Sequence, residues 1–231
     1  MCHLGTVEYR RAVAAQEHVR ALRQADELPD VLLTLDHPPV YTLGRRSEPG
    51  DLPMGEEWCR AQGVDVVATD RGGQLTYHGP GQLVGYPIMR IGDVIEYVRT
   101  MEQAMIAALA DEGVAAGIRP GLTGVWVGEE KVGSIGVHVS RGVTTHGFAI
   151  NVENDLAPFS WVVPCGLPDV SFTSVSRQRG ERIGLPCFRR HAAYRFCQAH
   201  GRRQRLVPPA RLGLHYLPSA PAPATRVGLP A

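Results

Sequence analysis

One lysine and one cysteine stand out as residues that could together perform nucleophilic chemistry. Of the 24 basic residues, 23 are arginine and only Lys131 is lysine. A lysine amine can release its proton whereas arginine keeps its proton, so a lone lysine indicates a position where arginine cannot serve. Cys165 lies between Pro164 and Gly166, in a constrained turn that favours presentation of the sulfur. The plain alternatives are a solvated lysine and a small buried cysteine.

A cysteine beside a lysine would form a workable nucleophile. A free thiol with a pKa near 8.5 is only about 3% thiolate at pH 7, and a neighbouring ammonium group lowers that pKa. The segment Lys131-Val-Gly-Ser-Ile-Gly136 also places two glycines within a strand pattern. Glycine inside a strand often marks the close approach of a ligand or of another backbone. The two segments together therefore predict a nucleophilic site.

A third segment, Arg71-Gly-Gly-Gln-Leu-Thr-Tyr-His-Gly-Pro-Gly-Gln82, has four glycines in twelve residues. Its backbone can approach a ligand closely, while Arg71, Tyr77 and His78 supply polar groups. It has neither the Gly-Lys-Ser/Thr element of a nucleotide-binding P-loop nor the G-x-G-x-x-G spacing. We interpret it as a ligand-binding loop, with a tight glycine-dependent hairpin as the alternative.

Histidines and further cysteines give weaker indications. His138 and His146 lie in a strand-rich segment, where either could act as an acid or base or be purely structural. No Ser-His-Asp or Cys-His-Asn order is recognisable. Four side chains of metal-ligand type follow near the C-terminus: Cys187, His191, Cys197 and His200. Their spacing matches no usual zinc pattern, so we expect no metal site.

The elements that must position these residues follow from apolar periodicity. One helix is expected from an N-cap at Thr6 to about Ala25, and another from an N-cap at Asp93 to Gly113. Strands are expected at residues 31–35, 64–69, 82–88, 124–128, 132–139 and 143–152. Because the strands fall mostly in hairpins, the pattern predicts a mixed α/β fold with a largely antiparallel sheet packed with helices, and not a doubly wound Rossmann domain.

Length and composition exclude several classes of protein. The 231 residues suit one α/β domain or at most two small ones, and the formal net charge of +1 favours no nucleic-acid partner. The longest apolar runs fall short of the roughly 20 residues that a membrane helix needs. No export signal is visible at the start, so a cytoplasmic location is expected. The five cysteines are odd in number and irregularly spaced, which indicates reduced thiols.

Charge divides the chain into two parts. Residues 1–175 hold 13 basic and 22 acidic residues, whereas residues 176–231 hold 11 arginines and a single acid, Glu181. Seven of the 18 prolines also lie in the second part. We therefore predict a catalytic body at residues 1–175, followed by a basic, Pro/Arg-rich segment of doubtful order at residues 176–231.

Five segments in order resemble the lipoyl(octanoyl) transferase family. They are His37-Pro-Pro-Val-Tyr-Thr-Leu-Gly-Arg45, Arg71–Gln82, Lys131–Gly136, His146-Gly-Phe-Ala-Ile-Asn151, and Pro164-Cys-Gly166 with Thr173-Ser174. The resemblance covers roughly residues 4 to 175. It implies a fold similar to the catalytic domain of biotin and lipoate protein ligases. It also implies transfer of an octanoyl or lipoyl group from acyl carrier protein to a lysine of the lipoyl domains of 2-oxoacid dehydrogenases or of the glycine-cleavage H protein.

The resemblance assigns roles by motif. Cys165 would carry the acyl group as a thioester, and Lys131 would lower the pKa of its thiol. Substrate would be bound by Arg71, Gly72, Gly73, Gln74, Leu75, Thr76, Tyr77, His78, Ser134, Ile135, Gly136, Gly147, Phe148 and Ala149. Lys131 or His78 would accept the proton of the attacking lysine. This chemistry requires neither ATP nor a metal or other cofactor.

Three alternatives remain open. An ATP-dependent lipoate protein ligase has a related fold, and an ATP-dependence assay would separate it. A non-catalytic module that binds carrier domains is the second, although the presence of both Lys131 and Cys165 counts against it. The third concerns residues 176–231, where the family continues with an acidic amphipathic helix but residues 177–200 are Arg-rich with poor apolar periodicity. This part is either a basic appendage that attracts acidic carrier proteins or an aberrant end, such as one caused by a reading-frame error.

Overall fold

A computed structural model describes residues 1–164 and 170–215 of the chain. Within them, a seven-stranded sheet has the order β1 (Cys2–Thr6), β2 (Val31–Asp36), β6 (Gln82–Ile88), β10 (Val143–Asn151), β9 (Glu130–Ser140), β8 (Leu122–Val127) and β7 (Gly117–Arg119). A three-stranded sheet has the order β4 (Asp65–Ala68), β3 (Val40–Leu43) and β5 (Thr76–His78). The helices are α1 (Tyr9–Gln24), α2 (Gly55–Ala61), α3 (Val94–Asp111), α4 (Val175–Arg179) and α5 (Leu185–Ala199). All pairs in the large sheet are antiparallel except β1 with β2, which confirms the predicted mixed, largely antiparallel fold.

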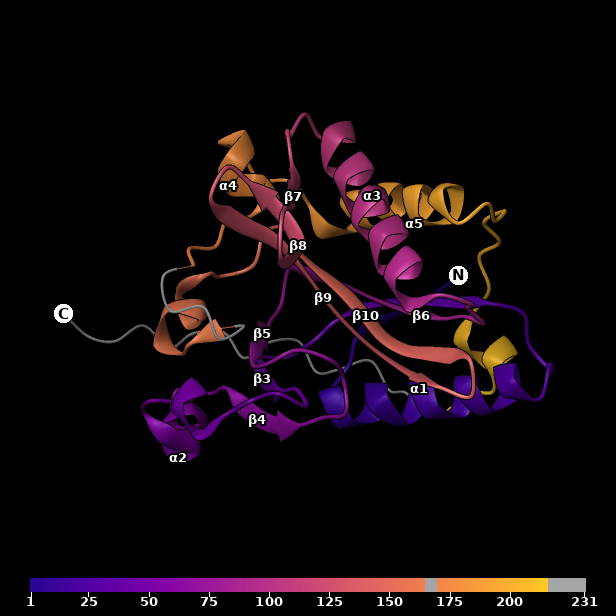
Figure 1. The fold of residues 1–231 in the computed structure, drawn as a ribbon, viewed down its shortest axis with the longest axis horizontal. Helices are drawn as coiled ribbons and strands as arrows, with labels where there is room; N and C mark the ends of the chain where they lie inside the picture. The colour runs from indigo at the N-terminus through magenta and orange to yellow at the C-terminus, as the bar shows by residue number, and fades with distance from the viewer. Residues whose placement is uncertain (165–169, 216–231) are drawn as a thin grey trace.

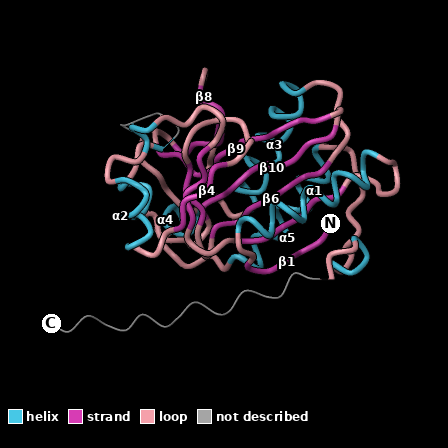
Figure 2. The backbone as a smooth tube through the Cα atoms, turned by 90° about the horizontal axis from the view of Figure 1, so that it is seen from below, coloured by secondary structure: helices cyan, strands magenta, loops and turns pink. Residues whose placement is uncertain are grey.

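Helices cover both faces of the large sheet. Figure 1 shows α3 and α5 on one face and α1 on the other. Side chains along β6 point alternately to the two faces of the sheet. Leu83 packs in the cluster with α3 and α5, whereas Val84 and Tyr86 pack in the cluster with α1. The small sheet has its own core with α2, around Tyr41 and Tyr77. The tube view in Figure 2 shows the strands crossing the molecule between these helices.

Several predicted elements are present where they were expected. Strand β6 spans Gln82–Ile88, and β8, β9 and β10 form the predicted meander. Helix α3 begins after Asp93, whose side chain accepts a hydrogen bond from the Glu96 N–H at 2.7 Å. Its regularly spaced Met101 and Met105 are buried. These elements were predictable because their apolar pattern and their caps are local features.

The start of the chain differs from the prediction. Helix α1 is not capped by Thr6. It begins at Tyr9, and the Glu8 carboxylate accepts hydrogen bonds from the N–H groups of Arg10 and Arg11, each at 3.0 Å. Thr6 instead ends β1, which pairs in parallel with β2 at the edge of the large sheet. A five-residue edge strand carries too few residues for a clear periodicity, so its pairing with β2 decides its conformation.

Residues 176–199, for which little order was predicted, contain most of helix α4 and all of helix α5. Helix α5 packs against α3 and buries Phe188, Ala192, Ala193 and Phe196 in the core. These residues follow a helical spacing, although arginines lie between them. Apolar periodicity was therefore present but was carried partly by alanines. Neither α5 nor any other helix of the described ranges is long and apolar enough to cross a membrane.

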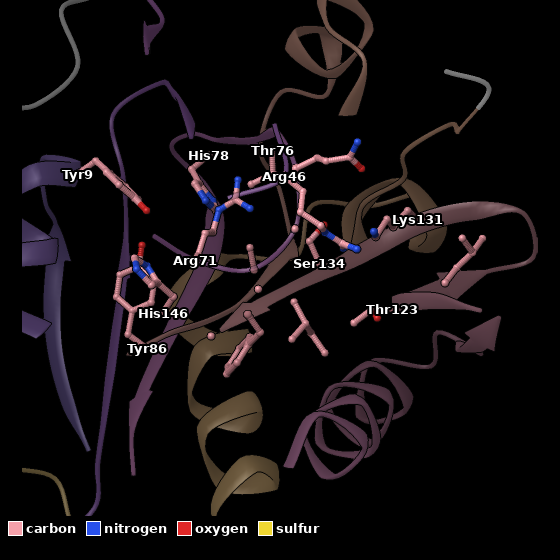
Figure 3. Close-up of a pocket in the computed structure, with 18 of the residues that line it drawn as sticks. Tyr9, Arg46, Arg71, Thr76, His78, Tyr86, Thr123, Lys131, Ser134 and His146 are labelled. Carbon is pink, nitrogen blue, oxygen red and sulfur yellow. The ribbon is translucent and has the colours of Figure 1, made fainter. Parts of the chain in front are cut away.

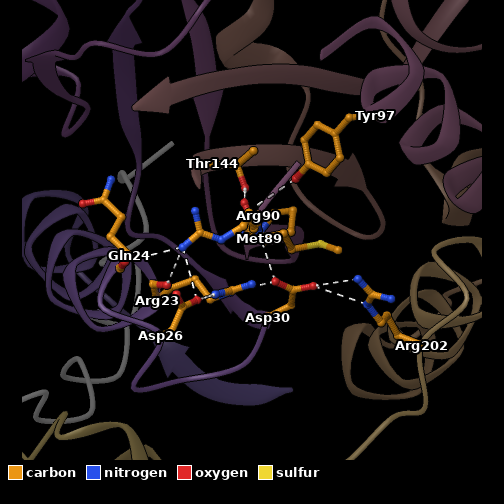
Figure 4. A network of polar contacts seen from close by, with 10 residues as sticks. Arg23, Gln24, Asp26, Asp30, Met89, Arg90, Tyr97, Thr144 and Arg202 are labelled. Atoms are coloured by element: carbon orange, nitrogen blue, oxygen red, sulfur yellow. Dashed lines mark hydrogen bonds and ion pairs between the residues drawn. The ribbon is translucent and has the colours of Figure 1, made fainter. Parts of the chain in front are cut away.

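An ionic network joins the segment after α5 to the body of the protein. Arg202 bonds to Asp30 Oδ2 at 3.1 Å, and the same carboxylate accepts from Arg23 Nε at 2.9 Å and from the Arg90 N–H at 3.1 Å (Figure 4). Burial alone would raise the pKa of Asp30, but these donors outweigh burial and lower it. In addition, the Val207 N–H bonds to the Met1 carbonyl at 2.9 Å. The segment from Arg202 to Val207 is thus attached to the residues that directly precede β1 and β2.

Candidate active site

A cavity of about 240 Å³ opens between the small sheet and strands β9 and β10. Figure 3 shows side chains converging on it from both sheets and from α1. The predicted binding residues that line it are Arg71, Gly73, Gln74, Thr76, His78, Ser134, Ile135, Gly136, Gly147, Phe148 and Ala149, together with Lys131. Three separate sequence motifs therefore meet around one space.

Three of the predicted binding residues do not line the cavity. Leu75 and Tyr77 point into the core of the small sheet, where the Tyr77 ring meets the Phe159 ring at 5.4 Å. Thr76 and His78 face the cavity because alternate residues of a strand lie on opposite sides. Gly72 has a backbone role, since its N–H bonds to the Val137 carbonyl at 3.0 Å and joins the glycine-rich loop to β9.

Arg71 is a buried cation in the cavity wall, only 7% exposed. Its guanidinium donates to Thr42 Oγ1 at 3.1 Å from Nε and to the Thr42 carbonyl at 2.6 Å from Nη2. The group passes so close to Gly44 that a Cβ there would lie 2.6 Å from Nη1. A fixed positive charge in a water-poor wall favours anionic or carbonyl groups in the cavity.

Lys131 lies on β9 and its side chain is almost fully buried, with 4% exposure, which excludes a solvated surface lysine. The chain crosses Gly124, where an added Cβ would lie 2.9 Å from Lys131 Cε. The ammonium nitrogen lies 5.3 Å from the centre of the Trp126 ring, within range of a cation–π contact. The glycine and the indole therefore fix the path of this side chain into the cavity wall.

Cys165, the predicted nucleophile, lies outside the described residues. The segment that follows it is placed by Lys131 itself: the Lys131 N–H bonds to the Ser171 carbonyl at 2.9 Å, and the Thr173 N–H bonds to the Lys131 carbonyl at 3.1 Å. On the preceding side, the Val163 N–H bonds to the Asp51 carbonyl at 3.0 Å. A contact between the thiol and the ammonium group stays a prediction.

Sequence reasoning placed His78 at the cavity, but not Tyr9 and Tyr86, which form one wall with it, nor the buried His37, which bonds to Tyr86. His37 Nδ1 donates to the Val7 carbonyl at 2.6 Å, so its Nε2 accepts from the Tyr86 hydroxyl at 2.8 Å. His78 Nδ1 lies 2.7 Å from Gln82 Oε1 and donates to it. Burial lowers the pKa of His37 to about 4 and also lowers that of His78. Both imidazoles are therefore neutral, which makes His78 a weak proton acceptor.

His146 is held in an uncommon backbone conformation at the same wall. Its φ is +57°, and its N–H bonds to Gln16 Oε1 at 2.6 Å. Its Nε2 lies 2.8 Å from Asp70 Oδ1, while its buried Nδ1 has no hydrogen-bond partner among residues 1–164 and 170–215. Burial lowers the pKa of His146, and the Asp70 carboxylate partly opposes this effect. Figure 3 shows His146 with Tyr9 and Tyr86 at one end of the cavity and Lys131 at the other.

Further residues that line the cavity were not predicted. They are Tyr9, Arg46, Tyr86, Gly121, Leu122 and Thr123. Tyr86 lies on a predicted strand and Tyr9 on a predicted helix, yet the side each faces depends on packing. His138, the other histidine considered, lies 3.6 Å from Asp70 and outside the cavity lining. Within the described ranges, no group of three or more His, Cys, Asp and Glu side chains could hold a metal ion.

Comparisons with known proteins identify relatives of this chain. The family model of the lipoyl protein ligase A/B catalytic domain matches residues 8–196. An octanoyltransferase of Acidothermus cellulolyticus is 48% identical over 189 residues, covering 78% of this chain and 82% of that protein. An octanoyltransferase of Mycobacterium marinum is 45% identical over 208 residues, covering 85% and 86%.

Solved structures show the same fold at lower identity. A lipoate-protein ligase A bound with ATP has a TM-score of 0.72 at 18% identity, covering 92% of this chain and 91% of that chain. A bi-partite lipoate protein ligase from Thermoplasma acidophilum has a TM-score of 0.71 at 19% identity, covering 90% and 86%. The chain belongs to the lipoyl protein ligase A/B catalytic domain family. Its curated relatives are octanoyltransferases, which makes it an enzyme of the acyltransferase class.

Proposed function

We propose that this enzyme transfers an octanoyl or lipoyl group from acyl carrier protein to a lysine of lipoyl domains, through a thioester on Cys165. The observation that carries the proposal is the single lysine of the chain, buried in the cavity wall and hydrogen-bonded through its backbone to residues 171–173, which follow Cys165. The octanoyltransferase relatives support the acyl group and the reaction class.

The first half-reaction forms the acyl-enzyme. The resting site holds a Cys165 thiolate beside a Lys131 ammonium, because the two charges stabilise each other. The thiolate attacks the carbonyl carbon of the carrier thioester, and the bond between that carbon and the carrier sulfur breaks. The ammonium group gives its proton to the departing carrier thiolate. The products are an acyl-cysteine, a neutral Lys131 amine and a free carrier thiol.

The second half-reaction restores the resting site. The acceptor lysine enters as a neutral amine and attacks the acyl-cysteine. The neutral Lys131 amine takes one proton from the attacking nitrogen, and the Cys165 thiolate leaves as the amide forms. Protons and charges then balance over the cycle, and neither ATP nor a metal is consumed. An arginine at position 131 could not exchange a proton in this way.

The apolar part of the lining supports an acyl substrate. Leu122, Ile135 and Phe148 contribute hydrocarbon surface to the cavity. Phe148 lies over Gly85 so closely that a Cβ on Gly85 would be 2.2 Å from the ring. The absence of a side chain on Gly85 therefore lets the ring lie against β6. Carrier protein and lipoyl domains are the proposed partners, and the reduced thiol that the chemistry needs fits the cytoplasm.

The test omits the acceptor. The enzyme is incubated with octanoyl-acyl carrier protein, and peptides are analysed by mass spectrometry. We expect one octanoyl group on the peptide that contains Cys165, none in a Cys165→Ala variant, and full labelling in the control Cys187→Ala, since Cys187 is an exposed free thiol. An octanoyl thioester that persists in Cys165→Ala would overturn the assignment of the nucleophile.

The competing function is that of an ATP-dependent lipoate ligase. It is considered because the fold is similar to that of a lipoate-protein ligase bound with ATP. Transfer to a lipoyl domain is measured with octanoyl-acyl carrier protein and with free octanoate, each with and without ATP. Transfer from the carrier without ATP supports the transferase. Transfer only from free octanoate with ATP would establish the ligase, and no transfer under any condition would favour a non-catalytic binding module.

A further inference from the structure

A second hollow opens beside the active-site cavity. It is lined by Arg45, Arg46, Ser47, Glu48 and Gln74, and it shares Arg46 and Gln74 with the cavity. In Figure 3, Arg46 lies at the same end of the cavity as Ser134 and Lys131. The hollow therefore adjoins the reacting end of the site, away from the histidines and tyrosines.

The backbone of this loop is fixed while its side chains keep free donors. The Arg45 N–H bonds to the Arg71 carbonyl at 3.0 Å, the Arg46 N–H to the Gly73 carbonyl at 3.1 Å, and the Ser47 N–H to the Gly44 carbonyl at 2.9 Å. Within residues 1–164 and 170–215, neither the Arg45 nor the Arg46 guanidinium has a hydrogen bond or an ion pair. The buried Ser47 Oγ likewise has no partner there.

The one acid of the hollow, Glu48, is tied through its backbone to the turn that follows it. The Asp51 N–H bonds to the Glu48 carbonyl at 3.0 Å, and the Asp51 carboxylate accepts the Glu48 N–H at 3.1 Å. The hollow therefore offers two guanidinium groups, a hydroxyl and the Gln74 amide as donors, and its two guanidinium charges exceed the single carboxylate charge of Glu48. A phosphate is a pure acceptor with several oxygens, and arginine is the side chain best suited to hold one.

We propose that Arg45, Arg46 and Ser47 bind the phosphate of the phosphopantetheine arm that carries the acyl group into the site. This inference rests on the proposed function, because it takes the donor to be a carrier-bound thioester. The arm is linear, with the thioester at one end and the phosphate at the other. When the thioester reaches the Lys131 end of the cavity, the phosphate remains at the mouth, where the hollow lies.

Two donors that differ by one phosphate give the sharpest test. Octanoyl-pantetheine and octanoyl-4′-phosphopantetheine are compared by kcat/KM for octanoylation of a lipoyl domain. We expect wild type to prefer the phosphorylated donor by about tenfold or more, the magnitude of a charge-assisted hydrogen bond. In Arg45→Gln and in Arg46→Gln, the ratio of the kcat/KM values for the two donors falls toward one. In Ser47→Ala the same ratio falls about twofold to threefold. Rising salt reduces the wild-type preference as well.

The controls separate this inference from the proposed function. Arg11→Gln removes an exposed arginine of α1 and leaves the wild-type ratio unchanged. Variants that lose activity equally with both donors would show that the loop acts on the reaction itself and would overturn the phosphate contact. Transfer by wild type without any phosphate preference would also overturn it. Failure of wild type to use either donor, or octanoyl-acyl carrier protein, would overturn the proposed function instead.

Coenzyme A offers the same arm from another source. Octanoyl-coenzyme A and octanoyl-acyl carrier protein are therefore compared in wild type and Arg45→Gln. A loss of about tenfold in kcat/KM with the carrier protein, whether or not coenzyme A responds, supports the proposed contact. A loss of kcat/KM with octanoyl-coenzyme A alone would mean that Arg45 binds the phosphates of the adenosine part, and this would overturn the proposal.

Discussion

The two ends of the active-site cavity differ in how their polar groups are satisfied. At the Tyr86 end, His37 and His78 bond to backbone and side-chain partners, and burial holds both rings neutral. At the Lys131 end, a cation lies against glycine and an indole ring, beside the segment that follows Cys165. The end with the neutral imidazoles gives the cavity its shape, whereas the end with a cation is the one that we propose carries out the reaction.

Replacing the cation at the reacting end has the largest expected effect. We expect Lys131→Arg to lower kcat by about 100-fold to 1,000-fold, the usual contribution of a general acid–base group. A guanidinium cannot give up its proton, and the path beside Gly124 has no room for a wider head group. Single-turnover octanoyl transfer measures the effect.

The matched control for that variant lies at the same indole. Arg119 lies 5.1 Å from the centre of the Trp126 ring, so Arg119→Lys exchanges the two cation types without touching the cavity lining. We expect its kcat to stay within twofold of wild type. A Lys131→Arg enzyme with more than a tenth of wild-type activity would contradict a proton-transfer role at this end.

Crowding the opposite end should destabilise the fold. In Gly147→Ala the new Cβ would lie 2.3 Å from the Gly85 carbonyl oxygen and 2.4 Å from Pro87 Cδ. Because β6 and β10 are paired, relief requires a backbone shift, and we expect a loss of about 3 kcal/mol in the free energy of unfolding. Urea denaturation measures it. Gly50→Ala is the control, since a Cβ there meets no atom within 4 Å, and equal effects of the two variants would contradict the tight packing.

The neutral histidines predict a loss of stability in acid. Burial lowers the pKa of His37 to about 4, below the value near 6.5 of the unfolded chain. As pH falls below about 6.5, His37 of the unfolded chain becomes protonated while His37 of the folded chain stays neutral. The free energy of unfolding therefore decreases until pH reaches about 4. At about 1.4 kcal/mol per pKa unit, the loss amounts to about 3 kcal/mol.

Urea denaturation between pH 7 and pH 4 checks this, with His37→Asn as the comparison. The variant is less stable at pH 7 because it loses the imidazole contact to Tyr86, but its stability should depend less on pH. His78 contributes in the same direction in both proteins, so the difference between the two curves isolates His37. Parallel curves would show that His37 takes up its proton in the folded protein.

The smallest expected effect concerns the network far from the cavity. Asp30→Asn removes the charge that Arg23 and Arg202 share, and we expect about 1 kcal/mol of destabilisation with unchanged kcat. Because the pKa of Asp30 is lowered, wild type holds this contribution above about pH 4 and loses it as pH falls further. Thermal melts at pH 7 and pH 3 measure it, with the more exposed Asp26→Asn as control. A large loss of activity in Asp30→Asn would mean that the C-terminal segment affects the cavity.

Prediction succeeded where the signal was local. The Asp93 cap and the spacing of Met101 and Met105 give helix α3, and the alternation from Gln82 to Ile88 gives β6. It failed where a distant partner decides the outcome: β1 is a strand because β2 lies beside it, and α5 is buried because α3 accepts its alanines. In the site, the motifs identified most lining residues, but not Tyr9 or Arg46, whose positions depend on how helix and loop pack.

The amino-acid sequence by itself determined the chemical groups: one lysine, a cysteine between proline and glycine, and glycines where backbones must pass closely. Residue type and local backbone preference are properties of short segments, so they can be predicted without knowing which other segments pack against them. Only the tertiary structure decided which side of β5 faces the cavity and how Tyr86 and His146 meet at one wall, with His37 bonded to Tyr86. Those relations come from strand pairing and burial across more than a hundred residues of sequence, where no short pattern records them.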